Sequence, residues 1–162
     1  MKKLTFIAVI IIFGLLQATV LNYVSIFNVK PDLLLISVVM ASLFFAPGWA
    51  LFLSVFAGII KDILSVNTFG FNSLLFFFWS FSIIKLSRSI TFDTNYIRLA
   101  LIFVIAVFNN IIARLASIFL GNFISWGISL RIAVIGPLYT AFIFPLALKL
   151  AKQLGFSEEQ IR

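Results

Sequence analysis

Residues 58–72 read Gly-Ile-Ile-Lys-Asp-Ile-Leu-Ser-Val-Asn-Thr-Phe-Gly-Phe-Asn, and this stretch decides how the chain is organised. It closes a long apolar run and contains Asp62, one of five acidic residues, directly after Lys61. Charged side chains at the edge of lipid are costly unless they are bonded, so this pair marks a site. Gly70 and Asn72 are typical of a turn, which predicts that one helix ends here and another begins.

The composition is that of a protein whose solvent is lipid. Of the 162 residues, 63% are hydrophobic and 10% are charged, and the mean hydropathy is +1.21. Soluble domains carry about 25% charged residues, so the sequence predicts an integral membrane protein embedded in the lipid bilayer. The net charge of +7 comes from Lys and Arg scattered around apolar runs, which indicates topology signals and no nucleic-acid partner.

Few residues are available for catalysis or metal binding. The chain contains neither Cys nor His, which removes disulfides, thiolate nucleophiles, histidine bases and the commonest zinc sites. It has no glycine-rich phosphate loop and no paired carboxylates on one helix. We therefore expect no enzymatic activity, no metal and no cofactor.

The apolar runs predict an all-α membrane protein with one integral domain over residues 1–162. We expect the Pro47-Gly48 pair to form a tight turn and Pro31 and Asp32 to open the second helix. The second and fourth helices are short for a span of about 20 residues, so we expect one or both to be tilted, half-embedded or re-entrant. Gly136-Pro137 and Pro145 interrupt the sixth. The expected helices cover residues 4–21, 31–46, 49–66, 73–86, 99–120 and 132–150.

The distribution of Lys and Arg predicts the orientation of these helices. Basic residues mark cytoplasmic ends, and most of them fall on the side of the N-terminus. That side holds Lys2, Lys3, Lys85, Arg88, Arg98, Lys149, Lys152 and Arg162, whereas the other holds Lys30, Lys61 and Arg131. We therefore expect both termini in the cytoplasm.

Several charged residues fall towards the external side in this topology. We hypothesise that Asp62 pairs with Arg114 or Arg131, which joins the third helix to the fifth and sixth. Two alternatives stay open: Lys61 and Asp62 are wet residues at a helix end, or they belong to a proton or substrate site. Asn109 and Asn110 are expected to hydrogen-bond between helices.

Two patterns resemble a known family. The first is Gln17-Ala18-Thr19-Val20-Leu21 followed by Lys30-Pro31-Asp32-Leu33-Leu34-Leu35. The second is Gly58-x-x-Lys61-Asp62-x-x-Ser65 followed by Phe69-Gly70-Phe71-Asn72. Their order and spacing resemble the bacterial rod shape-determining MreD family over nearly the whole chain.

The resemblance implies a non-enzymatic component of the cell-elongation machinery in the bacterial inner membrane. Its partners would be a bitopic MreC-like protein and, through it, the actin-like MreB and the peptidoglycan synthases RodA and a class B penicillin-binding protein. The fold would be similar to the S-components of energy-coupling-factor transporters. The family pattern implies a structural or partner-docking role for Pro31, Asp32, Gly58, Asp62 and Gly70, to which the charge pattern adds Lys61, Arg114 and Arg131.

We expect the partner's helix to pack in a groove at Gly58 and Asp62, because small residues let helices approach closely. The alternative function is a vitamin-binding subunit of an energy-coupling-factor transporter, which needs a pocket with several convergent polar groups. A flippase for a lipid-linked precursor is a third and weaker alternative, since the sequence lacks a continuous path of intramembrane charge.

The predicted orientation has a direct test. A reporter that is active only in the cytoplasm, fused after Arg162, should be active, because most basic residues lie on the side of the two termini. A fusion that is active only with a reporter for the cell exterior would contradict the prediction.

Overall fold

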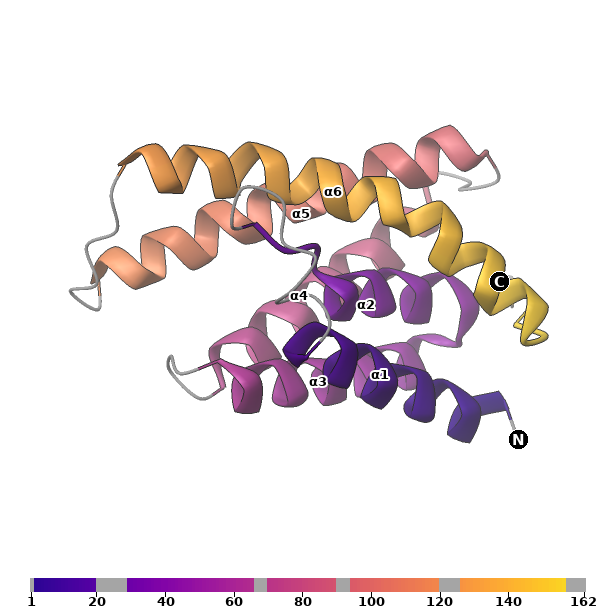
Figure 1. Ribbon diagram of the computed structural model, residues 1–162. Helices are drawn as coiled ribbons and strands as arrows, with labels where there is room; N and C mark the ends of the chain where they lie inside the picture. Colours follow the sequence, from indigo (N-terminus) through magenta and orange to yellow (C-terminus); the bar gives the residue numbers. More distant parts are fainter. Residues whose placement is uncertain (1, 20–28, 66–69, 90–93, 120–125, 157–162) are drawn as a thin grey trace.

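The computed structural model describes residues 2–19, 29–65, 70–89, 94–119 and 126–156, and the helices in these ranges pack into one bundle (Figure 1). This confirms the predicted all-α class. Three helices, α3, α5 and α6, are long and apolar enough to cross a membrane. The described helices are α1 (Lys2–Ala18), α2 (Leu33–Phe44), α3 (Pro47–Leu64), α4 (Phe71–Ser87), α5 (Asn95–Phe119) and α6 (Trp126–Gln153).

Helix α2 lies at the centre of the bundle and is buried on every side. All but one of its 12 residues are buried, and α1, α3, α4, α5 and α6 all contact it. A helix of this length is about 18 Å long, which is shorter than the hydrocarbon core of about 30 Å. Its two ends therefore lie inside the bundle, and their backbone groups need protein partners.

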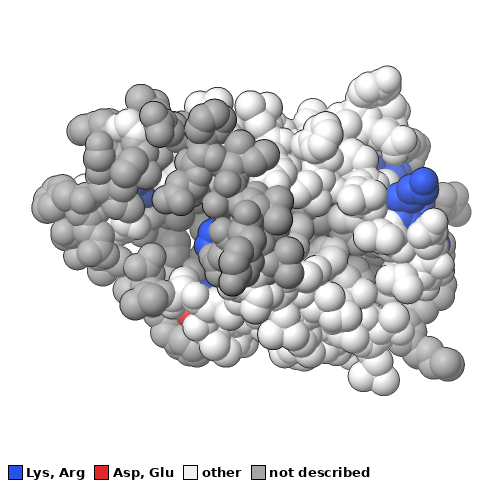
Figure 2. Space-filling model, in the orientation of Figure 1, with Lys and Arg blue, Asp and Glu red and all other residues white. Residues whose placement is uncertain are grey.

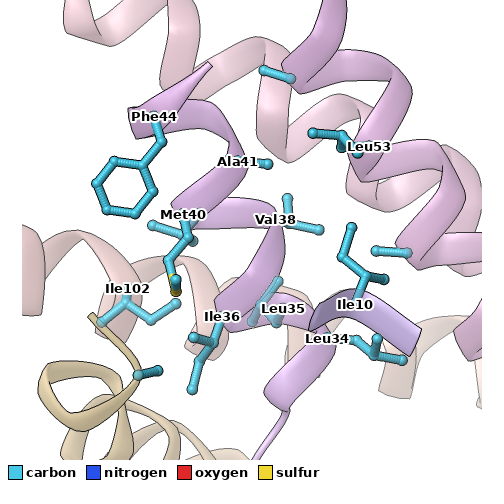
Figure 3. Close-up of a cluster of buried hydrophobic side chains, with 14 of the residues drawn as sticks. Ile10, Leu34, Leu35, Ile36, Val38, Met40, Ala41, Phe44, Leu53 and Ile102 are labelled. Carbon is cyan, nitrogen blue, oxygen red and sulfur yellow. The ribbon is translucent and has the colours of Figure 1, made fainter. Parts of the chain in front are cut away.

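The core forms around α2 from side chains of the surrounding helices. Figure 3 shows Leu35, Val38 and Met40 of α2 among Ile10 of α1 and Ile102 of α5, all of which are fully or almost fully buried. Because α2 is apolar all round, it has no face that suits water, and it folds only when it is covered by other helices.

Helices α5 and α6 form a long antiparallel pair that lies across the other four helices (Figure 1). Asn110 of α5 joins them, because its side-chain amide donates a hydrogen bond of 3.0 Å to the Ile132 carbonyl of α6. Gly136 leaves room for this amide, since a Cβ there would lie 3.0 Å from Asn110 Nδ2. The bond confirms the predicted interhelical role for Asn110.

Gly155 ends α6 and turns the chain back into the bundle. Its φ of +82° is a left-handed conformation that favours glycine. The Phe156 amide donates to the Ala151 carbonyl and the Gly155 amide to the Lys152 carbonyl, which is the Schellman arrangement. The Phe156 ring then packs edge-on against Phe6, so α6 is fixed to the start of α1.

Several helix ends differ from the sequence prediction. Pro47 is the first residue of α3 instead of part of a turn, because its fixed φ suits the first helical turn. Helix α5 begins at Asn95 and α6 at Trp126, both earlier than expected. Hydropathy locates the apolar part of a helix and misses the polar turn that precedes it.

Two further expectations about helix geometry need correction. Asp32 opens α2 as expected, but as the N-cap residue before Leu33, and Pro31 precedes it. Helix α6 is not interrupted at Pro137 or Pro145 and continues through both prolines as one helix. A proline removes one backbone hydrogen bond, and neighbouring helices hold the segment in helical geometry.

Candidate functional site

Asp62 is the most extensively bonded described side chain of residues 58–72. It lies in the last turn of α3 and is 2% exposed. Its Oδ2 accepts from the Gly70 amide at 3.0 Å, the Ser73 amide at 3.1 Å and the Ser73 hydroxyl at 2.6 Å. Its Oδ1 accepts from both the amide and the side chain of Asn72, each at 2.9 Å.

These five bonds make Asp62 the cap of a helix to which it does not belong. The first amides of α4 have no partner within that helix, and the carboxylate of α3 accepts from them. The negative charge also lies at the positive end of the α4 dipole, where an anion is stabilised. Gly70 allows the geometry, because its φ of +95° aims the chain into α4.

Gly58 lies one turn before Asp62 on the same face of α3. A Cβ at this position would lie 2.4 Å from the Ser73 Cα and 2.9 Å from the Asn72 carbonyl oxygen, both backbone atoms of α4. No side chain fits there without moving α4. Gly58 therefore sets the distance at which the Asp62 carboxylate reaches the amides.

Asp32 performs the corresponding role for α2. Its Oδ1 accepts from the Leu35 amide at 3.1 Å, which is a helix N-cap bond. Its Oδ2 forms an ion pair with Lys61, and both side chains are partly buried. The Lys61 ammonium also lies 4.8 Å from the centre of the Phe76 ring, a cation–π geometry.

Two more helices join the same network. The Gln17 side chain of α1 donates to Asp32 at 3.4 Å and accepts from the Leu34 amide at 3.2 Å. The Asp32 amide donates to the Thr140 hydroxyl of α6 at 3.1 Å. We call these residues the polar cluster: Gln17, Asp32, Lys61, Asp62, Asn72, Ser73 and Thr140.

The structure changes the interpretation of Asp62. It bonds to the start of α4 and not, as expected from the sequence, to Arg114 of α5. Since it is buried, it is also not a wet residue at a helix end. The ion pair in this region joins Lys61 to Asp32. The side chain of Arg131 lies outside the described residues, and the proton or substrate site stays a prediction.

Gly58 and Asp62 face α4, so they do not form the open groove that we expected for a partner helix. Pro31 is buried before the cap of α2, and Gly70 precedes α4. The role of these residues in the fold is therefore to position the starts of α2 and α4.

Sequence reasoning missed four members of the polar cluster, namely Gln17, Asn72, Ser73 and Thr140. Asn72 and Ser73 have a signal that was available, since Asn and Ser are common at helix starts. Gln17 and Thr140 have none, because they meet Asp32 from helices that are distant in sequence.

The bonding leaves little free capacity for chemistry at the two carboxylates. A carboxylate offers about four lone-pair sites, and Asp62 already accepts five bonds. Within the described ranges, no three His, Cys, Asp or Glu side chains gather as a metal site would require. The arrangement fixes helices in place.

Comparison with known proteins gives one match. A family model described as rod shape-determining protein MreD matches residues 1–149. No match is found among curated proteins or among solved structures. The expected similarity to the S-components of energy-coupling-factor transporters therefore stays a prediction.

Substituting Gly58 tests the close contact between α3 and α4. Gly58→Ala should lower the free energy of unfolding by about 1–3 kcal/mol, because the added methyl group overlaps the α4 backbone. Thermal unfolding of the purified protein in detergent measures the loss.

Gly48→Ala is the matched control, since a Cβ at that position of α3 has no atom within 4 Å. Alanine favours helix over glycine, so this control should be neutral or slightly stabilising. Equal effects at both positions would contradict the contact.

Substituting Asp62 tests the cap on α4. Asp62→Asn should lower the free energy of unfolding by about 2 kcal/mol or more. The asparagine NH2 group replaces an acceptor oxygen and then faces the backbone N–H groups of Gly70 and Ser73, which are also donors. A double-mutant cycle with Ser73→Ala, followed by thermal unfolding, should show coupling between the two positions.

Ser82→Ala serves as the control for that cycle, because the Ser82 hydroxyl bonds within α4 to the Phe78 carbonyl. It should show no coupling with Asp62→Asn. Recovery of stability when Asp62→Arg is combined with Arg114→Asp would restore the ion pair expected from the sequence and reject the cap.

Proposed function

We propose that the chain, which belongs to the MreD family of rod shape-determining proteins, is a non-enzymatic membrane scaffold of the cell-elongation machinery. The family match covers α1 to α5 and most of α6, and it places the chain in rod shape determination. The scaffold binds a bitopic MreC-like protein and thereby links MreB to peptidoglycan synthesis by RodA and a class B penicillin-binding protein. It lies in the inner membrane with both termini in the cytoplasm.

The internal use of the polar cluster is the observation that supports a scaffold over an enzyme or transporter subunit. Asp32 and Asp62 both cap helix starts, and the donors that face them come from the fold itself. A small-molecule site needs convergent polar groups that remain free to bind a ligand. The described helices also have extended apolar faces that suit packing against another helix.

Helix α5 has the face best suited to a partner's transmembrane helix. It is the least covered of the three long helices. In an apolar stretch of 18 residues, 22% of the α5 residues are buried, against 33% for α3 and for α6. Five of its exposed large apolar residues recur in alternating steps of four and three. They are Val104, Phe108, Ile111, Leu115 and Ile118, which we call the α5 stripe; Tyr96, Ile97 and Phe119 of α5 are exposed as well.

The spacing distinguishes the α5 stripe from the exposed apolar residues of α6. Steps of four and three keep a stripe nearly straight along a helix, which suits lengthwise packing of a second helix. On α6 most of the exposed large apolar residues recur in steps of four, from Val134 through Phe142 to Leu150, and Ile132 is exposed as well. Such a row winds about 40° around the helix at each step and suits a surface that faces lipid.

Photo-crosslinking in native membranes tests this proposal. A benzoylphenylalanine residue at Phe108 or Leu115 should crosslink to a single-pass MreC-like protein, because both positions lie on the α5 stripe. Affinity purification through a tag after Arg162, followed by mass spectrometry, identifies the crosslinked partner.

Phe142 and Leu146 of α6 are the matched controls, since they are the same residue types and are more exposed than Phe108 and Leu115. They should give no crosslink to that partner. Crosslinks at α6 alone would show that the partner contacts α6 and would contradict the assignment to α5. Purification with a bound vitamin and ATPase subunits, without a bitopic protein, would reject the scaffold itself.

A further inference from the structure

A cavity of about 470 Å³ lies between the start of α5 and the end of α6, at the opposite end of these helices from the loop that joins them. One part of its lining is basic and polar, and the other part is apolar. The polar residues are Asn95, Arg98, Lys149, Lys152 and Gln153, and the apolar ones are Leu99, Phe144, Pro145 and Leu148.

Three cationic side chains converge on this cavity from two helices. Arg98 is 4% exposed and lies in the first turns of α5, whereas Lys149 and Lys152 are exposed on α6. The two lysines are three residues apart, so they share one face of α6. Basic atoms gather at the right-hand edge of Figure 2, near the part of α6 that approaches its end in Figure 1.

The electrostatics of the cavity favour an anion. Like charges at this spacing repel one another, and the described residues of the lining contribute no carboxylate. The start of α5 adds the positive end of a helix dipole. A ligand with negative charge therefore gains from the two exposed lysines and the helix dipole at once.

The apolar wall narrows the class of ligand. Leu99, Phe144, Pro145 and Leu148 offer a hydrophobic surface directly beside the cations. A small soluble anion leaves this surface exposed. An amphiphile that has an anionic head and an acyl chain covers both parts of the lining, as basic pockets between transmembrane helices do with lipid head groups.

The fold holds one side of the cavity in place without a ligand. Gly155 ends α6 two residues beyond Gln153, and Phe156 packs into the core next to Phe6 and Phe45. The part of α6 that carries Lys149 and Lys152 is therefore anchored at its end. A preformed site of this kind loses less conformational entropy when a ligand binds.

We propose that this cavity binds the phosphate of an anionic glycerophospholipid. Lys149 and Lys152 contact the phosphate oxygens, and an acyl chain lies along Phe144 and Leu148. The site is separate from the polar cluster and from the α5 stripe, so it does not depend on the scaffold role. The occupancy of the cavity therefore depends on how much anionic phospholipid is present in the leaflet on this side of the membrane.

Native mass spectrometry of the full chain in detergent tests the site by titration with lipids. Phosphatidylglycerol should bind more tightly than phosphatidylcholine, which has the same phosphate and no net charge. Lys149→Gln combined with Lys152→Gln should weaken phosphatidylglycerol binding about twenty-five-fold, since each removed charge contributes about a factor of five. Both lysines are exposed, so the double variant keeps its core intact.

Lys3→Gln combined with Lys85→Gln is the matched control. It removes the same charge from exposed lysines of α1 and α4 that do not line the cavity. Its binding should equal that of the unaltered chain, and an equal twenty-five-fold loss would show general attraction to a basic protein and reject the site. The titration uses the full chain. Three acidic residues outside the described ranges, Asp93, Glu158 and Glu159, are then present when the lipid binds.

A second titration separates lipid from soluble phosphate. Glycerol 3-phosphate carries the same anionic group without acyl chains. Weak or undetectable binding of this compound, together with tight binding of phosphatidylglycerol, supports a lipid site. Tight binding of both, with the same loss in the Lys149→Gln and Lys152→Gln variant, would make the cavity a site for soluble phosphate compounds and overturn the lipid assignment.

Discussion

The bonds between the Asp62 carboxylate and the first amides of α4 are the interaction on which the rest of the bundle depends. In lipid, an amide at a helix start has no water to bond with, and each unsatisfied group costs several kcal/mol. Asp62 accepts from three backbone amides and two side chains, and it is itself stabilised by the α4 dipole. Gly58 contributes by removing the side chain that would hold the two helices apart.

The neighbouring residue extends this constraint to the centre of the bundle. Lys61 pairs with Asp32, and Asp32 caps α2, whose 12 residues cannot cross a bilayer alone. The Asp32 amide bonds to Thr140, which lies about 21 Å along α6 from its first residue. The start of α2 is therefore set deep beside α6. Lys61 and Asp62 together fix the depth of two helix starts from one turn of α3.

Sequence reasoning located the helices and the important turn, because apolar runs and an isolated Lys-Asp pair are visible in one dimension. It misassigned the partner of Asp62, because it looked for an opposite charge and found Arg114. The true partners are mostly backbone amides, which every residue has and no sequence pattern marks. Gln17 and Thr140 escaped for another reason, since only the folded bundle brings α1 and α6 to Asp32.

A membrane protein interacts through the groups that its own fold leaves unused. Here the described carboxylates and the polar side chains around them stabilise helix starts, so they have little capacity to bind anything else. Two kinds of surface remain: apolar helix faces, of which α5 has the least covered, and the basic side chains at the start of α5 and the end of α6. Apolar faces suit other helices, and basic side chains beside an apolar wall suit anionic amphiphiles. The physical character of both surfaces suits association with helices and lipids, in a chain whose family acts in cell shape.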